Sequence, residues 1–195
     1  MKAIPTMYKG ILFRSRLEAK WASFFDKVNW KWQYEPCDFD GWIPDFALYG
    51  DNGTAAYVEV KPTVVMLDDI ANEIDNSGCV DEVILLGETC PLPKCNFDDG
   101  VISLGWIREC CGITCSNLEV HDCSLNCNSL DYEWWWQNCH MTEINKRFGF
   151  CAELGDWKDR ITGIYDKSSW WGIDVDLIRG FWAEACNSSQ WRKPS

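Results

Sequence analysis

An amphipathic segment near the N-terminus, followed at once by three short extended segments, constrains the fold of this chain more than any other feature. Apolar residues recur at helical spacing in the first segment and form one stripe: Leu17, Trp21, Phe24, Phe25 and Val28. This spacing predicts a helix over residues 14–28 with one buried face. Ser15 stands at its start and Glu18 follows three residues later, which is the pattern of a capping box at a helix N-terminus.

Three stretches after this helix have the composition of strands. Residues 31–35 alternate between aromatic and polar side chains, and Pro36 ends the alternation. Residues 42–48 and 55–60 are the next two candidates, and the stretch 49–53 between them is rich in turn-forming residues. The sequence therefore predicts three strands in succession after the first helix.

A second helix and a fourth strand complete the predicted core. Residues 65–76 are predicted to be helical, and the apolar run 82–86 predicts a buried strand. A right-handed crossover then places the fourth strand parallel to the third. The predicted fold class is therefore α/β, with a mixed sheet flanked by helices, and the predicted core domain covers residues 1–88.

The remainder, residues 89–195, is predicted to be a Cys- and Trp-rich extension that packs on the core and ends in a helix over residues 174–186. The whole chain contains twelve Cys and thirteen Trp. It has no apolar run of the length that a membrane span requires, and its first residues lack the apolar block of a secretory signal. We therefore expect a cytoplasmic protein, in which Cys thiols are reduced and are either buried or bound to metal.

Six residues of the extension have spacings that suit a tetrahedral Zn²⁺ site: Cys110, Cys111, Cys115, His121, Cys123 and Cys127. A structural Zn²⁺ would contribute folding energy to a segment with little apparent core. Burial of the same thiols as small hydrophobic side chains accounts for the sequence equally well. Both interpretations stay open at this point.

The charge of the chain is unevenly distributed. The net charge is −12, but residues 1–35 carry seven Lys or Arg against three acidic residues. Residues 62–145 carry only two Lys or Arg against fifteen acidic residues. An acidic surface repels a polyanion, so any nucleic-acid site should involve the N-terminal end. The acidic middle region suits a protein partner better.

Two carboxylates and a lysine on neighbouring predicted strands are the strongest chemical signal in the chain. Glu59 and Lys61 are two residues apart, so their side chains leave the same face of a strand, and Asp45 lies on the strand before it. Oxygen ligands of this kind suit Mg²⁺ or Mn²⁺, whose charge stabilises a phosphodiester under attack. Lys61 would orient the attacking water or help it to lose its proton, and Glu18 could supply a further carboxylate to the metal.

Basic residues lie on or beside the helix that carries Glu18: Arg14, Arg16 and Lys20. They suit contacts with the phosphates of a nucleic acid, which would position the backbone without reading its sequence. A solvated helix face is the alternative interpretation, and the sequence favours neither.

These residues together resemble the PD-(D/E)XK nuclease superfamily. The resemblance rests on Pro44-Asp45, on Glu59-Val60-Lys61 and on Glu18, in the element order of the shared restriction-endonuclease-like core, and it covers residues 8–88. In closer detail the chain is similar to small phage-encoded nuclease-like proteins. The resemblance implies a DNA nuclease that uses Mg²⁺, with Asp45, Glu59 and Glu18 on the metal, acting in the cytoplasm of a host cell, either alone or as a homodimer.

The leading hypothesis from the sequence is therefore a metal-dependent endo- or exodeoxyribonuclease. The first alternative is a catalytically silent binding protein on the same scaffold, which would engage a host or phage protein through its acidic middle region. The second alternative is a zinc-stabilised DNA-binding module that uses the sheet only as a platform.

Overall fold

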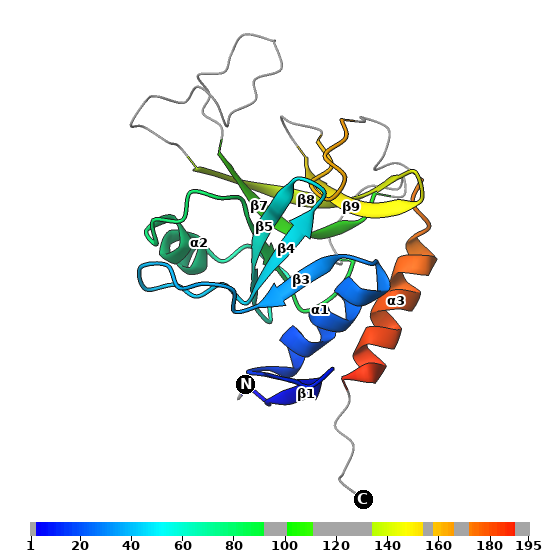
Figure 1. Ribbon diagram of the computed structural model, residues 1–195, viewed down its shortest axis with the longest axis horizontal. Helices are drawn as coiled ribbons and strands as arrows, with labels where there is room; N and C mark the ends of the chain where they lie inside the picture. The colour runs from blue at the N-terminus through cyan, green and yellow to red at the C-terminus, as the bar shows by residue number, and fades with distance from the viewer. Residues whose placement is uncertain (1–2, 92–100, 111–133, 154–157, 166–171, 190–195) are drawn as a thin grey trace, which may run out of the picture.

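A computed structural model describes residues 3–91, 101–110, 134–153, 158–165 and 172–189 of the chain. The fold is α/β, and its centre is one seven-stranded sheet in the order β3-β4-β5-β6-β7-β8-β9 (Figure 1). Its strands are β3 (Lys31–Tyr34), β4 (Phe46–Gly50), β5 (Gly53–Val60), β6 (Val83–Leu86), β7 (Ser103–Cys110), β8 (Trp134–Ile144) and β9 (Arg147–Ala152). Only the β5–β6 pair is parallel, so the sheet is mixed and mostly antiparallel.

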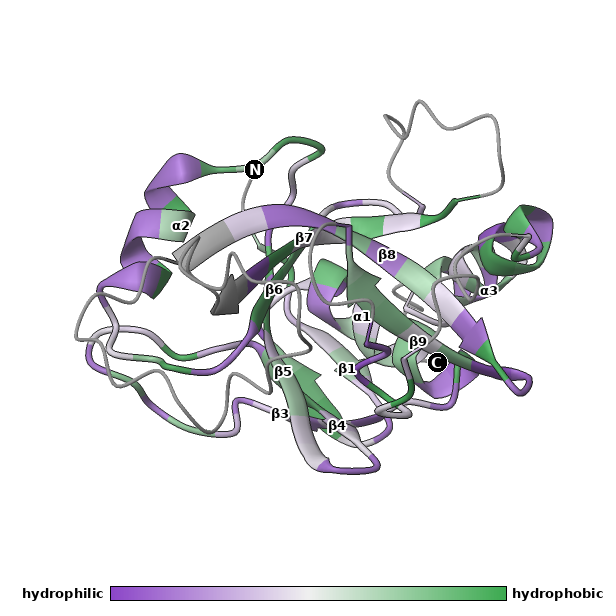
Figure 2. Ribbon diagram, turned by 90° about the horizontal axis from the view of Figure 1, so that it is seen from above, coloured by the Kyte–Doolittle hydropathy of each residue, from purple (hydrophilic) through white to green (hydrophobic). Residues whose placement is uncertain are grey.

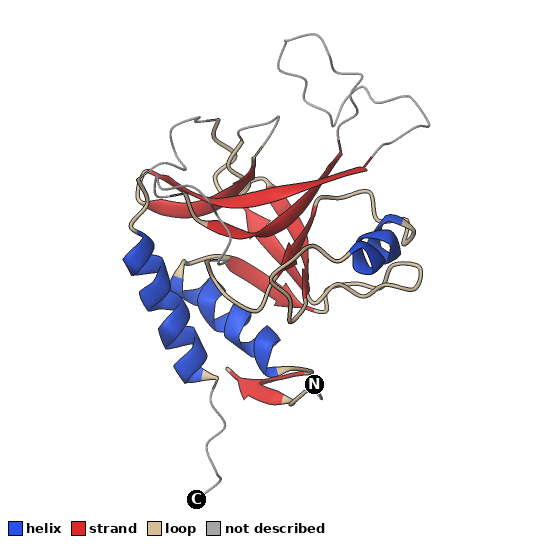
Figure 3. Cartoon of the chain, turned by 180° about the vertical axis from the view of Figure 1, so that it is seen from behind, coloured by secondary structure: helices blue, strands red, loops and turns tan. Residues whose placement is uncertain are grey.

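Helix α1 (Arg16–Lys27) packs against α3 (Val175–Ser188), and the two lie side by side beneath the sheet (Figure 3). The Ser15 hydroxyl accepts a hydrogen bond from the backbone N–H of Glu18, which confirms the predicted N-cap. The buried Trp21 packs against Trp182 of α3 with the two rings tilted, and it donates its indole N–H to the carbonyl of Gly87, 2.9 Å away. That bond fixes α1 to the end of β6, beside the strand that carries the candidate site.

Helix α2 (Asp68–Asp75) covers the opposite face of the sheet from α1 and α3, as the alternation along β6 shows. Ile84 packs in the large core between the sheet and the helices α1 and α3, whereas Val83 packs with Ile74 of α2. All of β6 is buried as a result, as its continuous apolar run predicted. Figure 2 shows α2 and α3 at opposite ends of the molecule.

The crossover between β5 and β6 is held by a buried arginine. Arg108 of β7 is fully buried, pairs with Asp75 of α2 at 3.1 Å, and donates to the carbonyls of Cys79 and Asp81. Backbone carbonyls and one carboxylate therefore surround a guanidinium that would be costly to bury alone. This contact sets where α2, which also lines the candidate site, lies against the sheet.

Several observed boundaries differ from the predicted ones. The strand predicted over residues 42–48 is β4, which begins only at Phe46. Trp42 instead bridges back to Phe39, and Pro44 has no N–H to donate. The second helix spans only Asp68–Asp75 of the predicted 65–76. The final helix begins at Val175, with Asp174 as its side-chain cap, and runs to Ser188.

Two groups of strands were not expected from the sequence. A hairpin of β1 (Thr6–Tyr8) and β2 (Ile11–Phe13) precedes α1. Strands β7, β8 and β9 extend the sheet beyond residue 88, so the predicted core and the predicted extension share one sheet. Within the described part of the chain, no helix has the length and apolar character needed to cross a membrane.

Candidate active site

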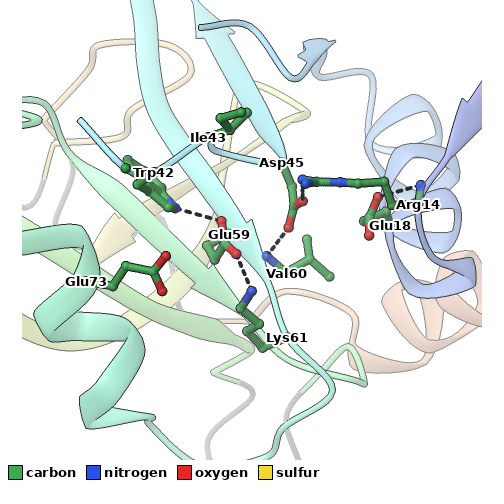
Figure 4. Close-up of a pocket in the computed structure, with 10 residues that line it drawn as sticks. Arg14, Glu18, Trp42, Ile43, Asp45, Glu59, Val60, Lys61 and Glu73 are labelled. Carbon is green, nitrogen blue, oxygen red and sulfur yellow. Dashed lines mark hydrogen bonds and ion pairs between the residues drawn. The ribbon is translucent and has the colours of Figure 1, made fainter. Parts of the chain in front are cut away.

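The four predicted catalytic residues meet in one pocket of about 330 Å³. Figure 4 shows its side chains converging from the start of α1, from the loop before β4, from the end of β5 and from α2. The residues that line it are Arg14, Glu18, Gly41, Trp42, Ile43, Asp45, Glu59, Val60, Lys61 and Glu73. The pocket therefore brings together residues that lie far apart in the sequence.

The end of β5 holds the two residues of the predicted Glu-X-Lys pair. Lys61 Nζ lies 2.5 Å from Glu59 Oε1, as expected for side chains that leave one face of a strand. Asp45 comes immediately before β4, and its Oδ2 accepts the backbone N–H of Val60 at 2.8 Å. This bond ties the Asp45 carboxylate to the strand that carries Glu59 and Lys61.

Three carboxylates of the site are buried close to one another, and both their burial and their mutual repulsion disfavour the charged form. Asp45, Glu59 and Glu18 are 4%, 5% and 6% exposed. Burial, followed by repulsion from Glu59 and Glu18, raises the pKa of Asp45 to about 7, against the lowering effects of the Val60 N–H and of Arg14. The carboxylates of the pocket therefore outnumber the cations that could neutralise them.

Lys61 is protonated in this arrangement. Burial acts to lower the pKa of Lys61, but the attraction of Glu59 and the hydrogen bond to it outweigh burial, so the pKa lies above its ordinary value. An ammonium group donates hydrogen bonds and has no lone pair to accept a proton. In this state Lys61 can orient a water or stabilise developing negative charge.

Glu18 of α1 bonds to Tyr34 at the end of β3 and to Arg14, which lies just before the helix. Its Oε2 accepts the Tyr34 hydroxyl at 2.7 Å and the backbone N–H of Arg14 at 3.1 Å. The same hydroxyl accepts the Arg14 backbone N–H, so three groups form a closed set of hydrogen bonds. Tyr34 was not predicted as a site residue, although its place at the end of an aromatic strand next to the Glu35-Pro36 pair offered a signal.

Trp42 is the second site residue that the sequence did not reveal. Its indole N–H donates to Glu59 Oε2 at 2.9 Å, and its ring stacks on Phe39 with centroids 5.5 Å apart. Glu59 therefore has one oxygen on Lys61 and the other on Trp42. A buried Trp usually finds an acceptor for its N–H, and the nearby Pro44-Asp45 pair made an acceptor at this site foreseeable.

The donor set suits a hard divalent cation with water in its coordination shell. In the part of the chain that the structure describes, no three His, Cys, Asp or Glu side chains are grouped closely enough to hold a metal ion. Mg²⁺ commonly needs only one or two carboxylates, because it keeps several waters. Asp45 and Glu59 supply two buried carboxylates to such a site. All three carboxylates also have partners within the protein: Asp45 bonds to Arg14 and Val60, Glu59 to Lys61 and Trp42, and Glu18 to Tyr34 and Arg14.

The remaining predicted residues lie in different places. Arg14 lines the pocket. Arg16 and Lys20 are partly exposed on α1 and are not among the described residues that line the pocket. Cys110 is the last residue of β7, and its side chain lies outside the described part of the structure. The other predicted Zn²⁺ ligands also lie outside the described residues: Cys111, Cys115, His121, Cys123 and Cys127.

Comparison of the chain with protein-family models, with curated proteins and with solved structures gave no match. A functional assignment for this pocket therefore depends on its geometry and on its chemistry.

Proposed function

We propose that the protein is a metal-dependent nuclease that hydrolyses phosphodiester bonds in DNA. One observation carries the proposal: Asp45, Glu59 and Lys61 meet at one pocket, with two buried carboxylates beside a protonated lysine. Carboxylates that hold a divalent cation, together with a nearby ammonium group, supply what phosphodiester hydrolysis needs.

The carboxylates of Asp45 and Glu59 would hold Mg²⁺ or Mn²⁺. The ion, when bound, lowers the pKa of a coordinated water and neutralises charge on the phosphoryl group. Trp42 holds Glu59 in place for this role, and the Val60 N–H does the same for Asp45. Glu18 supports the site by fixing the backbone of Arg14 beside it.

Lys61 would act on the reacting atoms. During hydrolysis the water oxygen forms a bond to phosphorus and gives up a proton to the solvent, the bond to the leaving oxygen breaks, and the leaving oxygen takes up a proton, so that one water is added in total. The Lys61 ammonium group would orient the water by donating a hydrogen bond to the water oxygen, and it would stabilise negative charge on the phosphoryl oxygens. Its ion pair with Glu59 keeps it protonated for that task.

The DNA would approach from the side of α1. Arg14 lies at the pocket with its side chain 55% exposed, and Arg16 and Lys20 continue along the helix. Their charges would contact phosphates on either side of the bond that is cut. The N-terminal end also has the only basic excess of any size in an otherwise acidic chain, so it is the part that a polyanion can approach.

The pairing of the charges favours a second candidate function. Asp45 is already paired with Arg14, and Glu59 with Lys61, so the two buried carboxylates each have a cation without any metal. A site satisfied in this way suits a catalytically silent protein that binds a basic partner protein through its acidic middle region. Such a protein would bind its partner in a salt-sensitive manner and would cut no DNA.

A cleavage panel separates the two functions. We would incubate the protein with supercoiled plasmid, linear duplex, single-stranded DNA and a branched junction, each with Mg²⁺, with Mn²⁺ and with a chelator. The nuclease proposal expects cleavage of at least one substrate that requires metal. Absence of cleavage from every substrate under every metal condition would overturn it and favour the binding function.

A further inference from the structure

Arg14 differs from the other cation of the pocket in how it is held. Lys61 directly follows β5, two residues after its partner Glu59, and its side chain is 32% exposed. Arg14 comes from a different element, just before α1, and its side chain is 55% exposed. Its Nη2 lies 2.8 Å from Asp45 Oδ1, which is the carboxylate oxygen that does not accept the Val60 N–H. Arg14 therefore occupies a place that it can leave at little cost in buried contacts.

Glu35 gives Arg14 a second anchor outside the pocket. Arg14 Nε lies 2.9 Å from Glu35 Oε1, and the Glu35 side chain is 38% exposed. The backbone N–H of Glu35 donates to the carbonyl of Asp45, so the two carboxylates stay close together. A guanidinium has five N–H donors, so it can keep its bond to Glu35 while it exchanges its other partner.

We propose that Arg14 is a displaceable counter-ion: it neutralises Asp45 in the metal-free protein, leaves that carboxylate when a divalent cation binds, and then contacts a phosphate of the DNA. This inference rests on the proposed nuclease function. It adds that metal binding and DNA binding are coupled through one side chain. Coupling of this kind is reciprocal, so DNA bound to Arg14 would also strengthen metal binding.

The electrostatics give the two binding events opposite responses to the loss of Arg14. A guanidinium in contact with Asp45 repels a second cation at the same oxygen, so its removal should strengthen metal binding. The same removal takes away a phosphate contact, so DNA binding should weaken. A residue that merely supported the pocket would weaken both when it is replaced.

The first test measures metal affinity directly. Isothermal titration with Mn²⁺ at about pH 8 would compare the wild-type protein with Arg14→Gln, which keeps hydrogen-bonding capacity and loses the charge. Arg179→Gln is the matched control, because Arg179 is an exposed arginine of α3 that does not line the pocket. We expect Mn²⁺ to bind Arg14→Gln about tenfold more tightly than wild type, and Arg179→Gln to bind it within about twofold of wild type.

The second test measures DNA affinity on a background that should not cut. Lys61→Ala and the double variant Lys61→Ala/Arg14→Gln would bind a fluorescent DNA duplex with and without Mn²⁺. We expect Mn²⁺ to strengthen DNA binding more in the single variant, because only that protein has a guanidinium to release. Equal strengthening in both proteins would overturn the coupling.

The outcomes distinguish this inference from the nuclease proposal. If Mn²⁺ binds the wild type and DNA is cut, but Arg14→Gln binds Mn²⁺ no more tightly, then Arg14 is not a displaced counter-ion and the nuclease proposal stands. If the wild type neither binds Mn²⁺ nor cuts DNA, both proposals are wrong. Urea unfolding of Arg14→Gln would verify that a change in affinity is not a loss of fold.

Discussion

The indole nitrogen of Trp42 lies 2.9 Å from Glu59 Oε2, and both residues are almost fully buried. The tryptophan belongs to the loop before β4, and the glutamate belongs to β5. Their bond therefore connects the loop that carries Asp45 to the strand that carries Glu59 and Lys61. The geometry of the pocket depends on this loop as much as on the sheet.

Replacing Trp42, whose N–H donates to a carboxylate, should cost more stability than replacing an equally buried tryptophan whose N–H donates to a neutral carbonyl. Trp30 is that control, because its N–H donates to the carbonyl of Phe148 at 2.8 Å and it is 4% exposed, against 3% for Trp42. Hydrogen bonds to charged groups contribute more than neutral ones, and an unsatisfied buried carboxylate is costly. We expect Trp42→Phe to lower the free energy of unfolding by about 1 kcal/mol more than Trp30→Phe does. Urea denaturation measures the difference, and an equal or smaller loss in Trp42→Phe would contradict the role assigned to Trp42.

The contribution of Asp45 to the stability of the metal-free protein should fall as the pH rises from about 4 to about 7. Burial and the repulsion of Glu59 and Glu18 raise the pKa of Asp45 to about 7, whereas an unfolded Asp has a pKa near 4. Between these values the folded protein holds a proton that the unfolded chain has lost, so raising the pH favours unfolding. The slope contributed by Asp45 is at most about 1.4 kcal/mol per pH unit.

Subtraction isolates the contribution of Asp45 from those of other carboxyl groups. Unfolding free energies in chelator would be measured across this range for the wild type and for Asp45→Asn, which cannot titrate. The difference between the two proteins should decline with rising pH up to about 7 and then stay constant. A difference that is constant throughout would mean that Asp45 is not perturbed.

A glycine of β7 that faces the backbone of the neighbouring strand β6 should be intolerant of a side chain. A Cβ on Gly105 would collide with the backbone carbonyl oxygen of Leu85 in the neighbouring strand. We expect Gly105→Ala to destabilise the protein by about 3 kcal/mol, at the upper end of the usual cost of overpacking. Gly180 lies within α3 with open space around it, so Gly180→Ala should instead stabilise the protein by about 1 kcal/mol.

Thermal or urea unfolding of both glycine variants tests whether the sheet continues past residue 88. Tolerance of Gly105→Ala would show that β7 does not pack against β6 as the structure has it. The Gly180→Ala variant controls for a general effect of adding a methyl group.

The sequence was informative where residue patterns are local. The helical stripe and the Ser15 cap gave α1 to within two residues at its start, and the apolar run gave β6. The convergence of Asp45, Glu59 and Lys61 also followed from the order of the strands. These features need only periodicity, capping and a crossover rule.

Two of the missed strands, β8 and β9, lack such local signals. The turn between β8 and β9 is made by Asn145 and Lys146, which both have positive φ, whereas the usual sequence for such a turn has Gly in the second place. The buried polar residues His140 and Thr142 also interrupt the apolar pattern of β8. Contacts such as Arg14 with Asp45 depend on side-chain packing across 31 residues of chain, so no sequence pattern encodes them.

One measurement tests the central claim most directly, namely the rate of plasmid cleavage in Mg²⁺ by the Lys61→Ala protein. Arg179→Ala is the control, because it removes one positive charge from the exposed surface of α3 and leaves the pocket intact. We expect Arg179→Ala to cut at the wild-type rate and Lys61→Ala to be slower by about a hundredfold or more. Cleavage by Lys61→Ala at the rate of the control would contradict the assignment of this pocket as the active site.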